Sequence, residues 1–389
     1  MINLPTIMYH SVGVPDADWI WNHLTIPFDL FEDHIRWLRK YNFNAIDFSE
    51  YYRFLHCGDP LPPNPVFLNF DDGYLDNWVF AYPILKKYGF KGTIFINPEF
   101  VQPHQVRRPT LEQVWKGELS HQELQTHGFL NWEEMRKMEA DGVMDIQSHA
   151  MTHTWYFAEP EIVDFRHPGD GYVWMDWNER PDMKWCYLNQ DIYKPFLRFG
   201  GPVYRHGKSL EVRRFYPESI IAKQLENFVA EQGLGFFDLH NWRNVLRMEA
   251  HKVLSKLRTE GRYETDSERR DRLHWELGES KKIIESKLSK QVSFLCWPGG
   301  GYDPEAIEIS KEYYLGSTVA SRDKTGSISR SVDGYVRIER IGCPYIEING
   351  KVRYTDGRYL YHYIKEYQGI KVHRTIRRGL KLLKVLGFI

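Results

Sequence analysis

The sequence predicts an α/β fold, in the form of a distorted (β/α) barrel with a large insertion and a C-terminal helical tail. Two observations support this prediction. Short apolar segments alternate with stretches of helical periodicity, which is typical of parallel α/β folds. These short segments are also apolar on both faces, as strands are when helices cover the outside of a barrel.

The expected elements follow one another through the first 150 residues and return near the end of the chain. Strands are expected at 6–12, 44–48, 65–70, 92–97, 143–148, 292–297 and 317–321. Helices are expected at 28–41, 77–89 and 132–142, and a long amphipathic stretch at 267–290 leads into the strand at 292–297. Gly89 and Gly142 close two of these helices, because glycine readily takes the left-handed conformation found after a helix end.

Residues 156–261 interrupt this alternation with a segment crowded with Trp, Tyr, Phe, Pro and Gly. We interpret the segment as an insertion, with helix-like sequence near 219–258, into a discontinuous barrel formed by 1–155 and 262–345. Residues 346–389 then form a C-terminal extension. The sequence therefore predicts three units, of which only the barrel is regular.

Composition narrows the possible functions. The net charge of the 389 residues is −1, which gives no indication of a nucleic-acid partner. The 4 cysteines form no closely spaced pair, so we expect neither a disulfide framework nor a zinc knuckle, but a reducing compartment. The start, MINLPTIMYHSVG, does not resemble a signal peptide, and no apolar run approaches the ~18 residues of a membrane span. We expect a cytoplasmic protein.

Polar residues gather where predicted strands end. Asp71 and Asp72 follow the strand at 65–70; a turn would explain them, but adjacent buried carboxylates repel each other. His149 and His153 follow the strand at 143–148, and on one helical turn this spacing would point both imidazoles the same way. Barrel enzymes carry their active sites on the loops after such strands. Two histidines with one carboxylate make a catalytic zinc-type set.

Two of these stretches resemble motifs of a known family. Residues 69–73, Asn-Phe-Asp-Asp-Gly, and residues 149–153, His-Ala-Met-Thr-His, are similar to the first two motifs of the polysaccharide deacetylases of carbohydrate esterase family 4, which share the NodB-homology domain. Softer matches include MYHSV at 8–12 and SFLCWPGGGYD at 293–303. The resemblance implies a distorted (β/α) barrel that removes an N-acetyl group from an amino sugar with the help of a metal.

The resemblance also implies a role for each site residue. Asp71 would be the general base, and the ligands of a divalent metal, expected to be Zn²⁺, would be Asp72, His149 and His153. Metal binding would neutralise Asp72 and remove most of the repulsion within the carboxylate pair. A backbone N–H near Pro298 and Gly299 would stabilise the oxyanion, and the implied substrate or oxyanion contacts are Trp297, Pro298, Gly299 and His10.

The chain departs from the family pattern in two places. Trp297 stands where many members have an arginine that orients the base, and the glycines that follow it either widen the groove or form a flexible turn. The Leu-x-His motif that supplies the general acid has no evident match in 337–346. The acid could be His10, His206 or His240, or Asp71 could shuttle the proton itself.

The expected function follows from the resemblance and from the composition. We expect hydrolysis of the N-acetyl group of an amino sugar in a cell-surface glycan or lipopolysaccharide precursor, on a lipid-linked substrate at the cytoplasmic face of the membrane. One alternative is a deformylase or another C–N hydrolase on the same scaffold. Another is a non-catalytic glycan-binding protein, against which the intact Asp71-Asp72 pair argues, because a binder has no reason to keep a costly charged pair.

Two further segments each allow two interpretations. Trp174, Trp177 and Trp185 either line a glycan groove near the mouth of the barrel or form the core of the insertion. The segment 371–389 has basic residues on one helical arc and apolar residues on the opposite one, without an acidic residue. It either binds an anionic membrane surface or docks its apolar face on the barrel. We expect this segment to bind the membrane surface.

Overall fold

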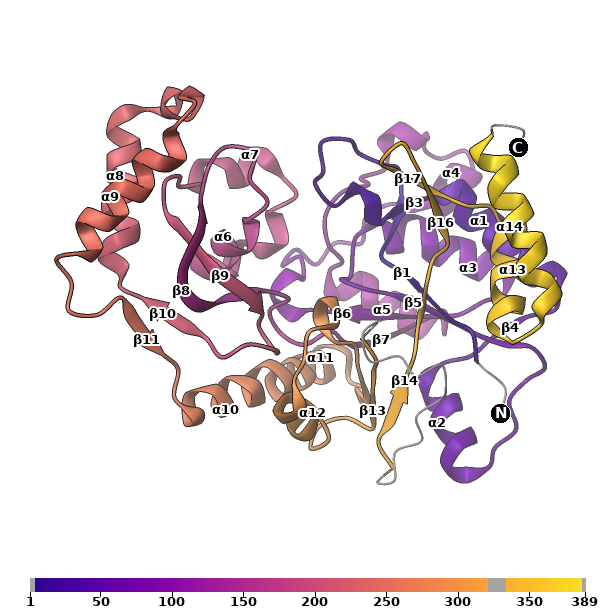
Figure 1. The fold of residues 1–389 in the computed structure, drawn as a ribbon. Coiled ribbons are helices and arrows are strands. Elements are labelled where there is room, and N and C mark those ends of the chain that lie inside the picture. Colours follow the sequence, from indigo (N-terminus) through magenta and orange to yellow (C-terminus); the bar gives the residue numbers. More distant parts are fainter. Residues whose placement is uncertain (1–3, 321–333, 387–389) are drawn as a thin grey trace.

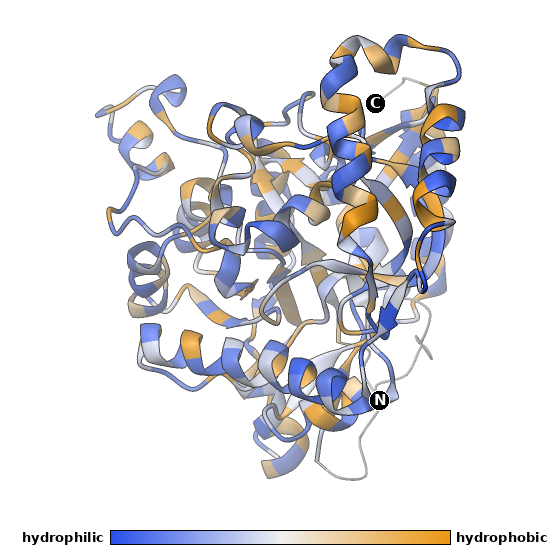
Figure 2. Cartoon of the chain, turned by 90° about the vertical axis from the view of Figure 1, so that its left-hand side faces the viewer, coloured by the Kyte–Doolittle hydropathy of each residue, from blue (hydrophilic) through white to orange (hydrophobic). Residues whose placement is uncertain are grey.

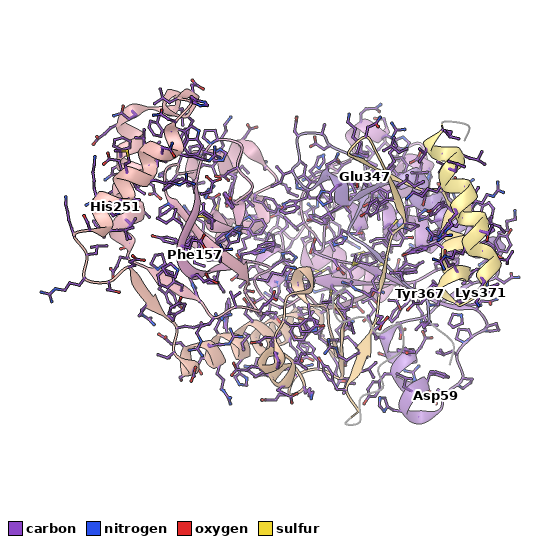
Figure 3. All side chains as sticks on the ribbon, viewed as in Figure 1. Asp59, Phe157, His251, Glu347, Tyr367 and Lys371 are labelled. Atoms are coloured by element: carbon purple, nitrogen blue, oxygen red, sulfur yellow. The ribbon has the colours of Figure 1, made fainter. Side chains whose placement is uncertain are left out.

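The computed structural model describes residues 4–320 and 334–386. Figure 1 shows two lobes: a barrel built from the two ends of the chain, and a smaller lobe formed by its middle part. His251 and Lys371 lie near the two outer edges of the molecule, one in each lobe (Figure 3).

Within residues 4–320 and 334–386, the barrel is a curled sheet of nine strands whose pairings are all parallel. The strand order is β14-β13-β12-β7-β6-β5-β1-β15, with β4 paired to β5 beside this path. The bounds are β1 Thr6–Tyr9, β4 Asn44–Ala45, β5 Pro65–Phe70, β6 Gly92–Ile96, β7 Met144–Ser148, β12 Phe294–Leu295, β13 Gly316–Thr318, β14 Val336–Ile338 and β15 Ile341–Gly342. This confirms the predicted distorted (β/α) barrel.

The strands are apolar on both faces because both faces are covered. Along β5, Val66, Leu68 and Phe70 belong to the main core, whereas Phe67 packs into a second cluster with residues of other strands. Successive side chains of a strand point to opposite faces, so one strand contributes to two cores. A short pair, β2 Ser11–Gly13 and β3 Thr25–Pro27, lies just after β1 in the sequence.

Helices surround the sheet, and in Figure 2 they carry alternating hydrophobic and hydrophilic residues. The bounds are α1 Phe28–Lys40, α2 Phe48–Cys57, α3 Tyr82–Tyr88, α4 Leu111–Trp115, α5 Trp132–Ala140, α10 Asp266–His274, α11 Ser280–Leu288 and α12 Pro304–Ser310. Gly89 ends α3 with a φ of 70°, as predicted. The stretch predicted at 267–290 forms α10 and α11, joined by a π-helical turn at Trp275–Glu279.

The smaller lobe has its own sheets and its own cores. Its elements are β8 Trp155–Phe165, α6 Val173–Glu179, α7 Gln190–Tyr193, β9 Pro202–Lys208, β10 Phe215–Pro217, α8 Ser219–Gln232, α9 Trp242–Leu254 and β11 Gly261–Tyr263. β8 pairs with β9 and β10 with β11, both antiparallel. Phe157 of β8 lies inside this lobe (Figure 3). Trp174 and Trp177 belong to one aromatic cluster, and Trp185 packs against it.

The chain ends in a hairpin and two helices. These are β16 Tyr345–Ile348, β17 Lys351–Tyr354, α13 Gly357–Tyr367 and α14 Lys371–Val385. Helix α13 packs on α1, and α14 packs on α13 at the edge of the barrel away from the smaller lobe (Figure 1). No helix among residues 4–320 and 334–386 is long and apolar enough to cross a bilayer.

Candidate active site

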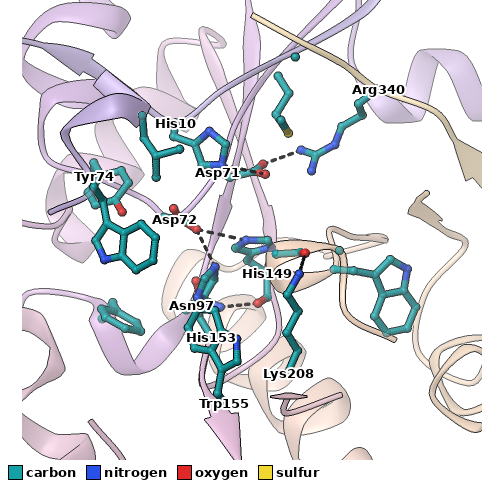
Figure 4. A pocket seen from close by; sticks show the side chains of 18 of the residues that line it. His10, Asp71, Asp72, Tyr74, Asn97, His149, His153, Trp155, Lys208 and Arg340 are labelled. Atoms are coloured by element: carbon teal, nitrogen blue, oxygen red, sulfur yellow. Dashed lines mark hydrogen bonds and ion pairs between the residues drawn. The ribbon is translucent and has the colours of Figure 1, made fainter. Parts of the chain in front are cut away.

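The polar motifs meet at one edge of the barrel. Asp71 follows β5, Asn97 follows β6, His149 follows β7, Trp297 lies just beyond β12, and Arg340 lies just beyond β14. Because these strands are parallel, their carboxyl ends lie at the same edge. The residues named here line a cavity of about 660 Å³, seen from close by in Figure 4.

Three of the predicted residues converge on one point. The Nε2 atoms of His149 and His153 each lie 3.2 Å from Oδ1 of Asp72 (Figure 4). One ligand atom from each of the three residues lies within 4.8 Å of the others. Asp72 Oδ1 is buried and accepts no hydrogen bond from the described part of the chain. A buried carboxylate oxygen facing two imidazole nitrogens fits a divalent metal.

The second ring nitrogen of His149 supports this assignment. Nδ1 lies 2.8 Å from the carbonyl oxygen of Cys296 and can only donate to it, which leaves the lone pair of Nε2 directed at the site. Asp71, His149 and Cys296 form a second possible group of ligands. Asp71, however, already pairs with an arginine, so the donor set of Asp72, His149 and His153 fits a metal better.

The predicted helical turn at 149–153 is wrong. The segment is an irregular loop in which Ala150 and His153 have left-handed φ angles of 58° and 43°, and Asp72 has a φ of 72°. Residues with side chains rarely adopt this conformation, and backbone strain of this kind concentrates at functional sites. The two imidazoles face the same oxygen because the loop turns back on itself, and not because of helical spacing.

Buried polar groups hold this loop in its strained form. The Glu276 carboxylate, in the π-helical turn, accepts hydrogen bonds from the backbone N–H groups of Met151, at 3.2 Å, and of Thr152, at 3.1 Å. It also accepts a hydrogen bond from the Thr152 hydroxyl at 2.5 Å. Asn97 donates to the carbonyls of His149 and Ala150. These bonds satisfy buried groups that would otherwise be costly to leave without partners.

The smaller lobe also contacts the loop. The Lys184 ammonium, which is 1% exposed, donates to the carbonyl of Thr152 at 2.8 Å and to Glu99 at 2.5 Å. The loop with the two histidines is therefore held from the barrel on one side and from the smaller lobe on the other.

Asp71 has a different environment from Asp72. Arg340 Nη1 donates to Asp71 Oδ1 at 2.7 Å, and His10 Nε2 lies 3.9 Å from Asp71 Oδ2. Burial alone would raise the pKa of the Asp71 carboxyl, but the charge of Arg340 and the nearby imidazoles outweigh it and hold this pKa below its usual value. Asp71 is thus held ionised next to the cavity.

The predicted oxyanion residues follow β12. Trp297 and Gly299 line the cavity, whereas Pro298 begins the short 3-10 turn Pro298–Gly300 and is not among the lining residues. The glycines do not widen the groove. The Lys208 side chain of β9 lies over them and donates to the Gly299 carbonyl, and a Cβ at Gly301 would come within 2.4 Å of it. Glycine is needed here because the smaller lobe packs so closely.

Of the three histidines considered as general acids, His10 lies next to Asp71. Burial lowers the pKa of His10, and the carboxylates of Asp72 and Asp71 offset this only in part. His206 lies beside Trp174 in the smaller lobe, and His240 is exposed there. Neither lines the cavity that contains Asp71.

Sequence reasoning missed Arg340, Lys208 and Glu276. The signal for Arg340 is present in the sequence, because the stretch 337–346 has no Leu-x-His motif but does contain this arginine. Lys208 and Glu276 carry no motif. They reach the site from β9 and from the π-helical turn, through contacts between residues far apart in the sequence.

The open parallel barrel and the carboxylate–histidine site together define the class: an α/β-barrel protein built like the carbohydrate deacetylases. Residues 58–173, which contain Asp71, Asp72, His149 and His153, match the family model of polysaccharide deacetylase. The match covers less than a third of the chain, and over these residues it confirms the resemblance that the motifs predict.

Relatives with curated names are similar over part of the chain. The candidate polysaccharide deacetylase YxkH of Bacillus subtilis (strain 168) is 31% identical over 150 residues, 39% of this chain and 43% of the relative. The poly-beta-1,6-N-acetyl-D-glucosamine N-deacetylase of Staphylococcus aureus (strain MSSA476) is 30% identical over 109 residues, 26% of this chain and 37% of the relative. The chain thus spans less than half the length of these relatives.

A solved structure extends the likeness to nearly the whole chain. The de-N-acetylase from Aggregatibacter actinomycetemcomitans matches with a TM-score of 0.52 and 18% identity, covering 87% of this chain and 95% of that one. At this identity the likeness concerns the fold alone.

Proposed function

We propose that this protein removes the N-acetyl group from an N-acetylhexosamine unit of a glycan, with the help of a divalent metal. The observation that carries the proposal is the convergence of Asp72, His149 and His153 beside an ionised Asp71 in one cavity. The names of the relatives from Bacillus subtilis and Staphylococcus aureus support a polysaccharide substrate, and the second supports a polymer of N-acetylglucosamine.

The metal, which we expect to be Zn²⁺, would be held by Asp72, His149 and His153 and would supply a positive charge that polarises the amide carbonyl and makes water more acidic. Asp71 then accepts a proton from the attacking water while the water oxygen bonds to the carbonyl carbon. The Arg340 guanidinium fixes the Asp71 carboxylate for this task through the 2.7 Å contact.

The second half of the reaction needs a proton on the leaving nitrogen. When the carbon–nitrogen bond breaks, the acyl group leaves as acetate and the sugar nitrogen takes the proton that Asp71 received. His10 Nε2 lies 3.9 Å from Asp71 Oδ2, so a bridging water or a small shift of either side chain would allow it to relay the proton. A histidine with a lowered pKa holds a proton weakly and passes it on readily.

The products separate this proposal from a deformylase. Incubation with N-acetylglucosamine oligosaccharides is expected to release acetate and free amine in equal amounts, and incubation with the N-formyl analogues is expected to release formate much more slowly. Faster release of formate than of acetate would favour the deformylase, and release of neither would contradict the proposal.

We further propose that the enzyme acts on a lipid-linked glycan at the cytoplasmic face of a membrane, to which α14 attaches it. Helix α14 docks on α13 through Leu380, which is buried, and through Arg377 and Lys384, which pair with Glu366 and Asp356.

The four cysteines are unpaired, which agrees with a reducing compartment.

Docking on α13 leaves much of α14 uncovered. Of its apolar residues, Val372 is 60% exposed, Leu382 59%, Leu383 40% and Val385 47%. Lys371, Arg374, Arg378 and Lys381 are exposed beside them, and no acidic residue occurs in the helix. An exposed apolar stripe flanked by cations is typical of helices that lie in the interface of anionic membranes. Residues 387–389 of the predicted segment 371–389 lie outside the described residues.

We expect the full chain to float with vesicles rich in phosphatidylglycerol at low salt and to remain unbound to phosphatidylcholine vesicles, because each cation near an anionic surface contributes about 1 kcal/mol. The double variant Leu382→Asp and Leu383→Asp is expected to lose flotation. Met248→Asp, which places one such charge on an exposed apolar position of α9, is the control for each of the two single changes. Flotation of the double variant like that of the control would contradict the membrane proposal and leave the deacetylase proposal standing.

A further inference from the structure

Helix α14 rests on α13 through a stripe of mostly titratable side chains. Among residues 371–386, the ones that are not exposed are His373, Arg377, Leu380 and Lys384, and of these only Leu380 is buried. Their spacing of four, three and four residues places them on one face of the helix. A docked helix usually turns an apolar stripe toward its support. Here three of the four contacting residues carry groups that can be charged.

Few contacts hold the joint between α13 and α14. Arg377 pairs with Glu366 at 2.5 Å, and Lys384 pairs with Asp356 at 2.6 Å. Beside these pairs, Leu380 packs in a small apolar cluster. Partly exposed ion pairs add little stability, so one repulsive contact in this joint weighs heavily.

The remaining contact joins two histidines. Nδ1 of His362 on α13 lies 2.7 Å from Nδ1 of His373 on α14, and the ring centroids are 4.8 Å apart. At this distance one nitrogen donates a hydrogen bond and the other accepts it, so one Nδ1 must carry no proton. If both imidazoles were positively charged, two N–H donors and two charges would face each other. The contact is therefore compatible with one charged histidine but not with two.

The nearest charges oppose protonation of the pair. Burial lowers the pKa of both imidazoles. The imidazole of His373 and the Arg358 guanidinium lower the pKa of His362 further, and the Lys365 ammonium does the same for His373. The docked form thus favours the state with fewer protons.

One carboxylate lies one helical turn from the pair. Glu366 follows His362 by four residues on α13, and two arginines of α14 engage it, Arg374 at 3.6 Å and Arg377 at 2.5 Å. Its charge is thus already balanced by cations.

Helix α1 also packs on α13. Its Tyr41 stacks on Tyr361 with ring centroids 3.9 Å apart, and the Tyr361 ring contacts both histidines. Lys40 Nζ lies 5.7 Å from the centroid of the Tyr41 ring, and Asp33 accepts a hydrogen bond from the Gly357 N–H at the start of α13. Toward the two histidines, α1 therefore presents aromatic rings.

We propose that His362 and His373 form an acid-sensitive latch, which holds α14 on α13 while at most one of them is charged and releases α14 when both are. The inference goes beyond the proposed function and does not require it. Release would expose Leu380 and free Arg377 and Lys384 from their partners on α13, which would extend the apolar and basic surface of α14.

The direction of the pH dependence follows from the lowered pKa of both histidines. The docked form takes up its second proton less readily than the released form, so acid favours release. The latch contributes its full stability above the ordinary histidine pKa of about 6.5 and loses it as the pH falls below that value.

Hydrogen–deuterium exchange of the full chain tests the latch. A released helix of this length is only marginally stable in water, so its amides lose protection. After correction for intrinsic exchange, we expect the protection of 371–385 to fall roughly 30-fold between pH 7.5 and pH 5.0, because the docked pair excludes one proton that a free histidine of pKa about 6.5 accepts. The protection of α1 is expected to stay constant. Equal protection of 371–385 at the two pH values would overturn the proposal.

Three variants assign the effect to the pair. His362→Asn and His373→Asn each keep a donor and an acceptor at this position but remove one titratable group. Each is expected to retain the protection of 371–385 at pH 5.0 within about threefold of its value at pH 7.5. His251→Asn makes the same change at an exposed position of α9 and is expected to show the full loss. A loss in both latch variants as large as in this control would overturn the proposal.

The measurement uses no vesicles and no substrate. Failure of α14 to bind anionic vesicles, or failure of the chain to release acetate, would therefore leave the latch standing. Conversely, a joint that stays closed at pH 5.0 would remove the latch and leave both parts of the proposed function unaffected.

Discussion

Alanine at Asp72, His149 or His153 is expected to abolish acetate release and to remove bound metal. Asp72, His149 and His153 each offer one ligand atom to the metal. Each change removes one of these three atoms and leaves only two. Loss of an outer-shell partner already weakens metal binding roughly 10- to 100-fold, so loss of a direct ligand is expected to weaken it further. Competition with a chromophoric chelator measures the change in affinity.

The matched control for the two histidines is His56→Ala. His56 is exposed on α2 and is not among the residues that line the cavity. This variant is expected to keep both metal and activity. Normal metal affinity in any of the three site variants would show that the metal, if bound, is held elsewhere.

Asp71→Asn is expected to keep the metal and to lose about 10²- to 10⁴-fold in kcat, which is the contribution typical of a general base. Asparagine has nearly the same shape and still accepts from Arg340 through its carbonyl oxygen, but it cannot take up a proton. Initial rates of acetate release check this result. A kcat within a few-fold of the unaltered enzyme would assign the base to another residue.

The fold could be predicted because its signals are local. Apolar segments such as 65–70 and 92–97 became β5 and β6, and Gly89 ends α3 in the left-handed conformation. Short strands were harder to find. β14 and β15 contain three and two residues, too few to show a period, although they form the two ends of the sheet.

The candidate site could be predicted only where a motif identifies it. The Asp71-Asp72 pair and the two histidines are such motifs, and the structure brings them together, although their chemical roles stay predictions. The geometry of the loop at 149–153 could not be foreseen. It depends on Glu276, more than 120 residues further along the chain, and on Lys184 from the other lobe.

Arg340 illustrates the same limit in another way. The sequence shows that the usual arginine is absent beside Trp297, but not that the end of β14 lies close enough to Asp71 to supply one. In the sheet, only β1 lies between β5 and β15. Arg340 directly precedes β15, and Asp71 directly follows β5, so the strand order brings the two residues close together. Only the topology of the sheet contains that information.

The most direct test of the account is the metal content of two single variants measured side by side. Asp71→Asn and Asp72→Ala change neighbouring carboxylates of the same cavity, to which we assign different tasks. After loading with Zn²⁺ and removal of the excess, the account predicts about one equivalent of metal in Asp71→Asn and almost none in Asp72→Ala, with little acetate released by either. Equal metal content in the two variants, or metal lost from Asp71→Asn and kept by Asp72→Ala, would contradict it.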